Sequence, residues 1–246
     1  MNAPATDAVS LFALQPFPTI EPGDDLAAAL TGALSASGTR LHDGDVLIVA
    51  SKPVSIAEGR YVDLATITPS AQALELSART GKPAELVELI LQESHSHVLA
   101  TESGPIIARH RLGLELTSAG VDRAGPEGAW LLPADPDASA RALREAVTQH
   151  TGAAPAVVIA DSDGRGDRRG ATVISIGAAG VAPLRISEHA EPDGRLKRQG
   201  ETLTDMIAAA AGLILGQRGR GAPVVVLRGL AYPAGDKGVR SMLHHR

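Results

Sequence analysis

Short apolar runs that end in turn residues constrain this fold more than any other feature of the sequence. Three of them, at residues 45–50, 155–160 and 223–227, are rich in valine, isoleucine and leucine. Such runs are typical of buried strands, and here they alternate with segments of helical periodicity. The sequence therefore predicts a mixed α/β protein with mixed sheets largely covered by helices.

The remaining pattern predicts the order of the elements. Helices are expected at residues 24–34, at 71–78 behind a Ser70 cap, and at 83–93, 137–149 and 202–215. A strand, a turn and a second strand are expected within residues 98–116, and a further strand at 171–178. We expect the strand at 155–160 to stop at Asp161, Asp137 to cap its helix, and residues 190–200 to form a surface loop.

Composition excludes several classes of protein. The chain has no cysteine, which removes disulfides, thiol nucleophiles and cysteine-based zinc sites. The longest apolar run, at residues 207–215, is half of the roughly 20 residues that a membrane span needs, and residues 1–10 lack a signal-peptide pattern. A net charge of −5 and only five aromatic residues argue against nucleic-acid binding. A cytoplasmic protein without membrane or nucleic-acid partners is expected.

Familiar nucleotide and nucleophile motifs are missing. The sequence contains no Walker A phosphate loop, no dinucleotide-binding glycine fingerprint after a strand, and no nucleophile elbow. A nucleotide would therefore have to be bound in another way.

The strongest candidate site follows the strand at 155–160. Asp161 and Ser162 offer hard oxygen ligands of the kind that magnesium and manganese prefer, and three arginines that could hold phosphates follow in a glycine-rich stretch, Arg165, Arg168 and Arg169. In open α/β sheets, ligands bind beyond the carboxyl ends of such strands. The same residue types are equally typical of a solvated turn with compensating charges.

Weaker candidates lie elsewhere. Asp122 follows a glycine after a strand-like segment and could share a metal with Asp161, although turn aspartates are common. Ser51 and Lys52 follow the strand at 45–50 and could contact phosphate, or simply be exposed. Other features have sound structural explanations, namely the helix start at Asp137, the glycine- and arginine-rich stretch from Gly216 to Gly221, and the pair His95 and His97.

Ordered short motifs across nearly the whole chain resemble one family, the coenzyme F420-0:L-glutamate ligases, also called F420 gamma-glutamyl ligases. The residues that carry the resemblance are Pro22–Leu26, Asp43–Leu47, Ser51-Lys52, Val54-Ser55, Ala57–Arg60, Gly81–Pro83, Ala119–Asp122, Leu131–Pro133, Asp135–Asp137, Asp161, Gly164-Arg165, Arg168, Ile176-Gly177, Asp205 and Arg228–Leu230.

The resemblance implies a fold and an activity. It implies one catalytic unit over residues 1–246, built as two interleaved subdomains without a Walker A loop, and a homodimer. It implies GTP-dependent addition of L-glutamate, through an amide bond, to the lactyl carboxylate of coenzyme F420-0 by way of an acyl phosphate, with gamma-glutamyl extension of the chain. Mg²⁺ or Mn²⁺, two ions per site, would be required, with K⁺ as a further candidate cation.

The resemblance also assigns roles to residues. Asp161 and Arg165 are the expected catalytic residues, and the expected metal ligands are Asp122, Asp161, Ser162 and Gln217. Arg168 and Arg169 are candidate phosphate ligands. The expected nucleotide contacts are Pro16, Phe17, Pro18, Thr19, Ser51, Lys52, Gly125, Leu213, Gly216 and Arg218.

Several positions depart from the family pattern and mark the chain as a divergent member. Ile56 replaces a usual lysine, Gly125 an asparagine, Pro16 a glycine and Met206 an acidic residue, and Gly166-Asp167 stands where an aromatic residue is usual. Two alternatives therefore remain open. The chain could be a nucleoside-triphosphate-dependent amide ligase for another acid and amine, or a binding homologue without turnover.

Overall fold

The computed structural model describes residues 8–216 and 221–244, and its centre is a five-stranded sheet. The strand order is β1 (Ser10–Ala13), β13 (Val224–Arg228), β2 (Val46–Ala50), β9 (Ala156–Gly164) and β10 (Ala171–Ala179). β2 and β9 run parallel, and the other neighbouring pairs are antiparallel. The three apolar runs of the sequence become the three central strands, and the predicted mixed α/β class is confirmed.

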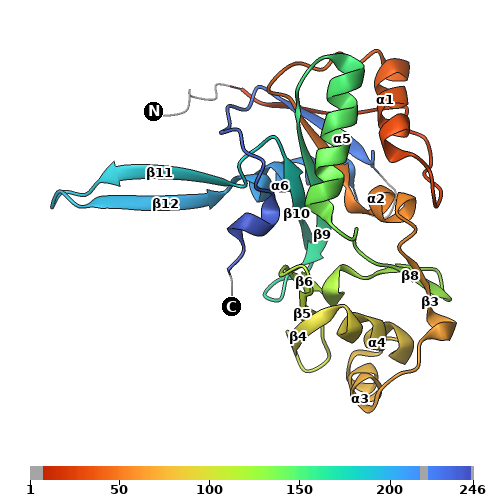
Figure 1. Cartoon of the computed structure of the whole chain (residues 1–246). Helices are drawn as coiled ribbons and strands as arrows, with labels where there is room; N and C mark the ends of the chain where they lie inside the picture. The colour runs from red at the N-terminus through yellow and green to blue at the C-terminus, as the bar shows by residue number, and fades with distance from the viewer. Residues whose placement is uncertain (1–7, 217–220, 245–246) are drawn as a thin grey trace.

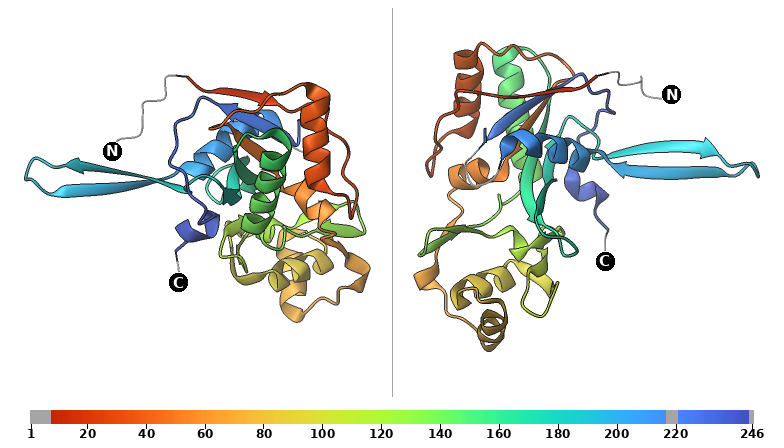
Figure 2. Two further views of the ribbon diagram at one scale, coloured as in Figure 1. Left: turned by 45° about the horizontal axis from the view of Figure 1, so that its top comes forward. Right: turned by 180° about the vertical axis from the view of Figure 1, so that it is seen from behind.

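Helices cover both faces of this sheet (Figures 1 and 2). α5 (Pro136–Thr151) packs against β9 and β10, with α1 (Leu26–Ser37) beside it, and α6 (Leu203–Leu215) packs across the opposite face. Side chains of β2 and β9 such as Leu47, Ile48 and Ile159 are fully buried between these layers. None of the helices in residues 8–216 and 221–244 is long and apolar enough to cross a membrane.

A second, smaller core lies below the central sheet in Figure 1. It is built from α3 (Ala71–Thr80), α4 (Ala84–Gln92) and two small antiparallel sheets, with α3 packed on α4 and α4 on the strand β4. One sheet has the order β3 (Tyr61–Asp63), β8 (Gly128–Trp130), β7 (Asp122–Ala124), and the other β4 (Ser94–Leu99), β5 (Ile106–His110), β6 (Glu115–Thr117). α2 (Ser51–Ala57) leads from the central sheet into this part. Whether the two cores act as subdomains stays a prediction.

Two expectations for strands were wrong. β9 does not stop at Asp161 but continues to Gly164, because its last residues pair with the start of β10. Only residues 191–195 of the predicted loop at 190–200 form a turn, and the rest belong to strands. They complete a two-stranded arm, β11 (Leu184–Ala190) with β12 (Leu196–Thr202), which projects from the body in Figures 1 and 2. The arm is solvated on both faces, so its sequence has no alternation of apolar and polar residues to reveal the strands.

The start of α5 also differs from the expectation. Asp135, not Asp137, is the N-cap, and it accepts a hydrogen bond from the backbone N–H of Ala138 at 3.0 Å. Asp137 is buried in the first turn, where its carboxylate accepts from the backbone N–H groups of Ala178, Val239 and Arg240. This side chain therefore ties α5 to β10 and to the short turn η3 (Val239–Met242).

A buried ion-pair cluster joins α4 to β5. Glu93 is 5% exposed, and its carboxylate contacts Arg111 and lies 3.4 Å from the His110 Nε2 atom. Burial opposes ionisation of Glu93, but its interactions with His110 and Arg111 outweigh it and lower the pKa of this carboxyl to about 2. Glu93 therefore remains charged in the folded protein.

This cluster predicts a pH-dependent contribution to stability. A carboxyl whose pKa falls on folding stabilises the folded state above its unfolded value near 4.5, and the stabilisation is lost as the pH falls toward 2. We expect Glu93→Gln to lower the free energy of unfolding at pH 7 by about 3 kcal/mol, and by much less at pH 2.5. Urea titrations of both proteins at the two pH values measure this, with the exposed Glu75→Gln as control. Equal losses at both pH values would contradict the assignment.

Candidate active site

Segments far apart in the sequence meet at one edge of the central sheet. β1 ends there, β13 begins there, and β2 ends beside β9 where β9 passes the edge. The register pairs that show this are Ala13 with Val225, Val49 with Val224, and Ala50 with Ala160. This edge is the carboxyl end of the parallel pair, where α/β proteins commonly bind ligands.

Two consecutive residues at this edge hold the two candidate metal aspartates. The Ser51 hydroxyl, at the first position of α2, donates a hydrogen bond to the Asp161 Oδ1 atom of β9. The Nζ atom of Lys52 lies 3.3 Å from the Asp122 Oδ2 atom. Ser51 is buried, whereas Lys52 and Asp122 are exposed. The fold thus brings together Ser51, Lys52, Asp122 and Asp161, which the sequence offered as separate candidates.

A left-handed turn places Asp122 at this edge. Ser118, Ala119 and Gly120 form the turn η2 (Ser118–Gly120), with φ angles of 53°, 52° and 65°. Residues with side chains rarely adopt such angles, and Ala119 does so while buried. A side chain at Gly120 would collide with Leu132, so glycine is needed at this position. A single residue separates this strained turn from β7, which begins with Asp122.

Negative charge gathers around Asp161. Burial raises the pKa of Asp161 to about 7, the nearby carboxylates of Asp122 and Asp163 also raise it, and the Ser51 hydrogen bond lowers it. Burial likewise raises the pKa of Asp163, which accepts a hydrogen bond from the backbone N–H of Thr117 at 2.8 Å. Because these carboxylates lie close together, they favour binding of a cation; we call Asp122, Asp161 and Asp163 the acidic cluster.

The donor set suits a hard divalent cation. Mg²⁺ is commonly bound by one or two carboxylates together with water and substrate phosphates. Asp122 and Asp161 are such a pair, and the exposed Ser162 follows Asp161 on β9. Among residues 8–216 and 221–244, no group of three or more acidic, histidine or cysteine side chains converges into a metal cage. Gln217, the remaining expected ligand, lies outside the described residues.

The three candidate phosphate arginines lie in or beside the exposed loop between β9 and β10. Arg165 and Arg168 both face Asp167, at 3.8 and 3.1 Å from its carboxylate. Arg165 also interacts electrostatically with Asp163, whereas Arg169 is exposed. The structure therefore brings Arg165 toward the acidic cluster, while Arg168 is paired within its own loop.

The expected nucleotide segments gather at the same edge. Residues 16–19 follow β1, and Leu213 and Gly216 lie at the end of α6, which leads toward β13. Leu213 is 86% exposed, and the backbone N–H of Ala222 donates to the carbonyl of Ile214, which turns the chain back into the sheet. Arg218 lies outside the described residues.

The structure shows where three of the residues that depart from the family pattern lie. Ile56 is half-buried on α2 and packs against the central core. Gly125 has a φ of 69° in the exposed turn between β7 and β8, and Met206 is exposed on α6. Beside Met206, Asp205 accepts hydrogen bonds from the backbone N–H and the hydroxyl of Ser175 and so fixes α6 to β10.

Sequence reasoning missed one residue of this site. Asp163 joins β9 to β6, because its carboxylate accepts a hydrogen bond from the backbone N–H of Thr117. The Thr117 hydroxyl in turn donates to the carbonyl of Gly164. The expectation that β9 ends at Asp161 hid this role. The alternation of Asp161 and Asp163 along a continuing strand is the signal that could have shown that both point to one face.

Comparisons with known proteins identify the family of this chain. Residues 16–229 match the model of the F420-0:gamma-glutamyl ligase family. The chain is 37% identical to the coenzyme F420:L-glutamate ligase of Methanothermobacter thermautotrophicus, over 97% of this chain and 96% of that protein. It is 39% identical to the protein of that name from Archaeoglobus fulgidus, over 90% and 88% of the two chains, and 42% identical to that from Methanopyrus kandleri, over 86% and 83%. The chain therefore belongs to the F420-0:gamma-glutamyl ligase family.

Proposed function

We propose that this protein adds L-glutamate to coenzyme F420-0 in a reaction that consumes GTP and requires a divalent cation. The observation that carries the proposal is the arrangement of Ser51, Lys52, Asp122 and Asp161 at the carboxyl edge of β2 and β9. Family membership and the printed names of the relatives support the choice of substrates.

The proposed reaction has two steps. An oxygen of the lactyl carboxylate attacks the γ-phosphorus of GTP, which gives an acyl phosphate and GDP. The amine of L-glutamate then attacks the acyl carbon, the C–N bond forms, and inorganic phosphate leaves with the electrons of the broken C–O bond. Each step transfers a group between highly charged partners, so the protein must hold the reactants together and offset their charge.

Residues of this chain fit those two tasks. Arg165 and Lys52 are cations beside the acidic cluster and are positioned to hold phosphate oxygens. Ser51 fixes the orientation of the Asp161 carboxylate. Asp122 and Asp161 would hold Mg²⁺ or Mn²⁺, together with Ser162 and Gln217, and the ion would offset the charge on the transferred phosphoryl group. In this proposal, the segments at residues 16–19 and 213–218 contact the nucleotide.

Mass spectrometry of a single reaction tests the proposal. Purified protein is mixed with coenzyme F420-0, L-glutamate, MgCl₂ and MnCl₂, with GTP or ATP in separate tubes and K⁺ present or absent. We expect F420-0 to gain one or more glutamyl masses with GTP, and the gain to disappear with a chelator. Unchanged F420-0, beside an active relative as a positive control, would overturn the proposal.

Ile56 and Gly125 favour testing a second candidate, a ligase of the same reaction class for another acid and amine. If F420-0 is unchanged, release of phosphate from GTP with other acid and amine pairs would identify this candidate. No phosphate release with any pair, combined with measurable nucleotide binding, would identify a homologue that binds without turnover.

The proposal predicts that Lys52 contributes to nucleotide use. Because the usual lysine is replaced by Ile56, Lys52 is the cation that α2 offers to a phosphate. We expect Lys52→Gln to lower kcat/KM for GTP at least about 10-fold, the effect of losing one charged hydrogen bond. Steady-state rates measure this, with the exposed Lys237→Gln as the matched control. Equal rates for the Lys52 variant and the unaltered enzyme would exclude the role.

We also propose that the protein is a homodimer and that the arm takes part in the contact. An isolated pair of strands is only marginally stable in water, yet β11 and β12 leave the body with Ile186 and Leu196 exposed at 42% and 73%. Sedimentation of the protein and of an Ile186→Lys/Leu196→Lys variant tests this. We expect a dimer that the two charges weaken, and a monomeric unaltered protein would overturn it.

A further inference from the structure

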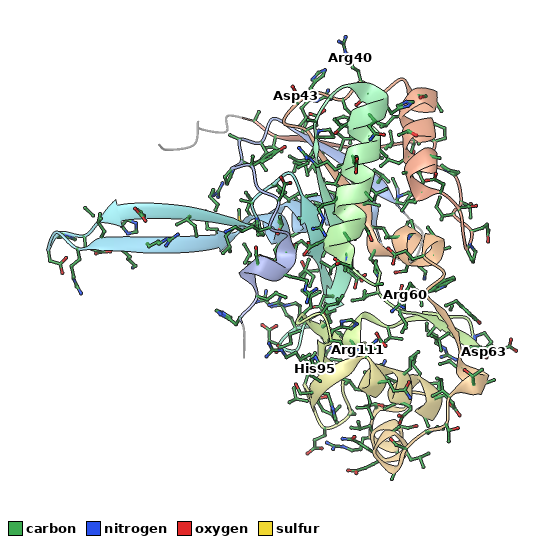
Figure 3. All side chains as sticks on the ribbon, in the orientation of Figure 1. Arg40, Asp43, Arg60, Asp63, His95 and Arg111 are labelled. Atoms are coloured by element: carbon green, nitrogen blue, oxygen red, sulfur yellow. The ribbon has the colours of Figure 1, made fainter. Side chains whose placement is uncertain are left out.

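A basic cavity lies away from the acidic cluster, between the β4–β5 hairpin and the C-terminal turn. Its volume is about 550 Å³, which is within the usual range for small-molecule sites. The charged or titratable side chains that line it are His95, Arg109, Arg111, Arg240 and His244, and none of the described lining residues is acidic. Figure 3 shows His95 and Arg111 beside each other at this end of the hairpin. Three arginines in one cavity are notable in a chain of net charge −5.

Charge in the cavity is only partly compensated. Arg111 contacts the buried Glu93, but its side chain is still 53% exposed. Arg109 donates to the carbonyl of His244 at 3.0 Å, a neutral partner. Arg240 has no ion pair within residues 8–216 and 221–244. Glu115 is opposite Arg109 on β6 but does not line the cavity. An anion would therefore find positive charge here that carboxylates neutralise only in part.

Local backbone structure directs side chains into the cavity. The register of β4 against β5 shifts between Ser94 and Ser96, so that His95 lies in a bulge. Bulges change the direction of a side chain and are frequent next to functional sites. On the other wall, the turn η3 that carries Arg240 is fixed by the buried Asp137. Both walls are thus held by the fold.

The cavity lies close to the exposed loop between β9 and β10, which begins with Arg165. Ile107 and Arg109 lie two residues apart on β5, so their side chains are on the same face. Ile107 packs beside Gly166, the loop residue that lies between Arg165 and Asp167 in the sequence. Arg109 is therefore two residues along one strand from the residue that contacts this loop. A substrate whose reacting end lies at Asp161 could extend along this face into the cavity.

We propose that the cavity binds the α-carboxylates of a γ-linked glutamyl tail, and so supports additions after the first one. This inference rests on the proposed function. Each γ-linked glutamyl residue keeps one free α-carboxylate, so the tail is a chain of separated negative charges. Arginines contributed by different chain segments match such a chain better than they match a single phosphate, and arginine is well suited to binding carboxylates in pairs of hydrogen bonds.

The test compares successive additions. F420-0 and glutamate are incubated with the unaltered enzyme, with Arg109→Gln/Arg240→Gln, and with Arg141→Gln, an exposed arginine on α5, as the matched control. Mass spectrometry follows each product over time. We expect the double variant to slow the second addition at least about 10-fold relative to the first, since two charged contacts are removed, and the control to leave that ratio unchanged. Arg240→Gln alone, which removes no bond within the described fold, should give part of the effect.

A direct binding measurement separates this inference from the proposed function. Calorimetric titration uses γ-linked triglutamate, inorganic phosphate and free glutamate as probes, with no nucleotide present. We expect γ-linked triglutamate to bind the unaltered protein more tightly than the other two, and the double variant to bind it at least 10-fold more weakly. If no glutamate is added to F420-0 but this binding difference appears, the proposed function fails and the cavity assignment stands. Equal binding by both proteins, tighter binding of phosphate, or a double variant that extends the tail as far as the unaltered enzyme overturns the inference.

Discussion

Asp161→Asn is expected to lower the rate of glutamate addition at least about 100-fold while leaving the protein folded. The substitution keeps the shape of the side chain and removes its negative charge, so a divalent cation loses one of two carboxylates at the edge of β9. Because the ion offsets charge in the transition state, the loss should appear in kcat and not only in KM. Mass-spectrometric rates at saturating GTP and glutamate measure it.

Stability distinguishes this loss of activity from unfolding. The pKa of Asp161 is raised by folding to about 7, so ionisation of this group destabilises the folded chain as the pH rises from about 4 to 7. In a metal-free buffer with a chelator, Asp161→Asn should therefore melt at the same temperature as the unaltered protein near pH 4, and at a higher temperature at pH 7. Asp63→Asn, an exposed aspartate at the end of β3, serves as the control and should be fully active. An Asp161 variant with normal turnover would show that the metal assignment is wrong.

Asp137→Ala is expected to have the largest effect on stability, a loss of about 4 kcal/mol in the free energy of unfolding. Its carboxylate accepts hydrogen bonds from three backbone N–H groups, on β10 and on the turn η3. Removing it leaves these donors buried and unpaired, and each such group costs roughly 1–3 kcal/mol. For a chain of this size, the melting temperature should fall by about 8–16 °C.

Asp135→Ala calibrates that measurement. Asp135 lies two residues earlier on the same helix start, but it makes an ordinary N-cap bond to Ala138. Its loss should cost about 1 kcal/mol, which corresponds to about 2–4 °C. Urea and thermal melts of the two variants give the comparison. Equal losses would mean that the bonds of Asp137 to β10 and η3 add nothing beyond helix capping.

Most of the core could be predicted from the sequence because burial leaves a pattern. The runs at 45–50, 155–160 and 223–227 became the central strands, and Ser70 caps α3 as expected. The arm could not be predicted, since strands exposed on both faces carry no apolar alternation. Asp137 was wrongly predicted to be the N-cap of its helix. Its long-range hydrogen-bond partners, Val239 and Arg240, cannot be inferred from the local sequence.

The candidate site was predictable in its residue types but not in its geometry. The apolar runs before Asp161 and Ser51 indicated one edge of the sheet as a candidate site, because ligand sites favour the carboxyl ends of strands, and the fold places both residues at that edge. The pairing of Ser51 with Asp161 and of Lys52 with Asp122 depends on the order of strands, which no local pattern contains. The basic cavity combines residues from two hairpin strands and the C-terminal turn, and was missed for the same reason.

The way in which the central sheet closes also has a consequence for biosynthesis of the protein itself. β13, which is made after every other strand of this sheet, is inserted between β1 and β2, which are made first. The contact between Ser51 and Asp161 alone spans 110 residues. Contacts between such distant residues carry a large loop-closure entropy and form late and slowly. A chain still on the ribosome that has not yet released β13 therefore lacks the strand between β1 and β2, and with it a complete central sheet behind the edge where Ser51 and Asp161 meet.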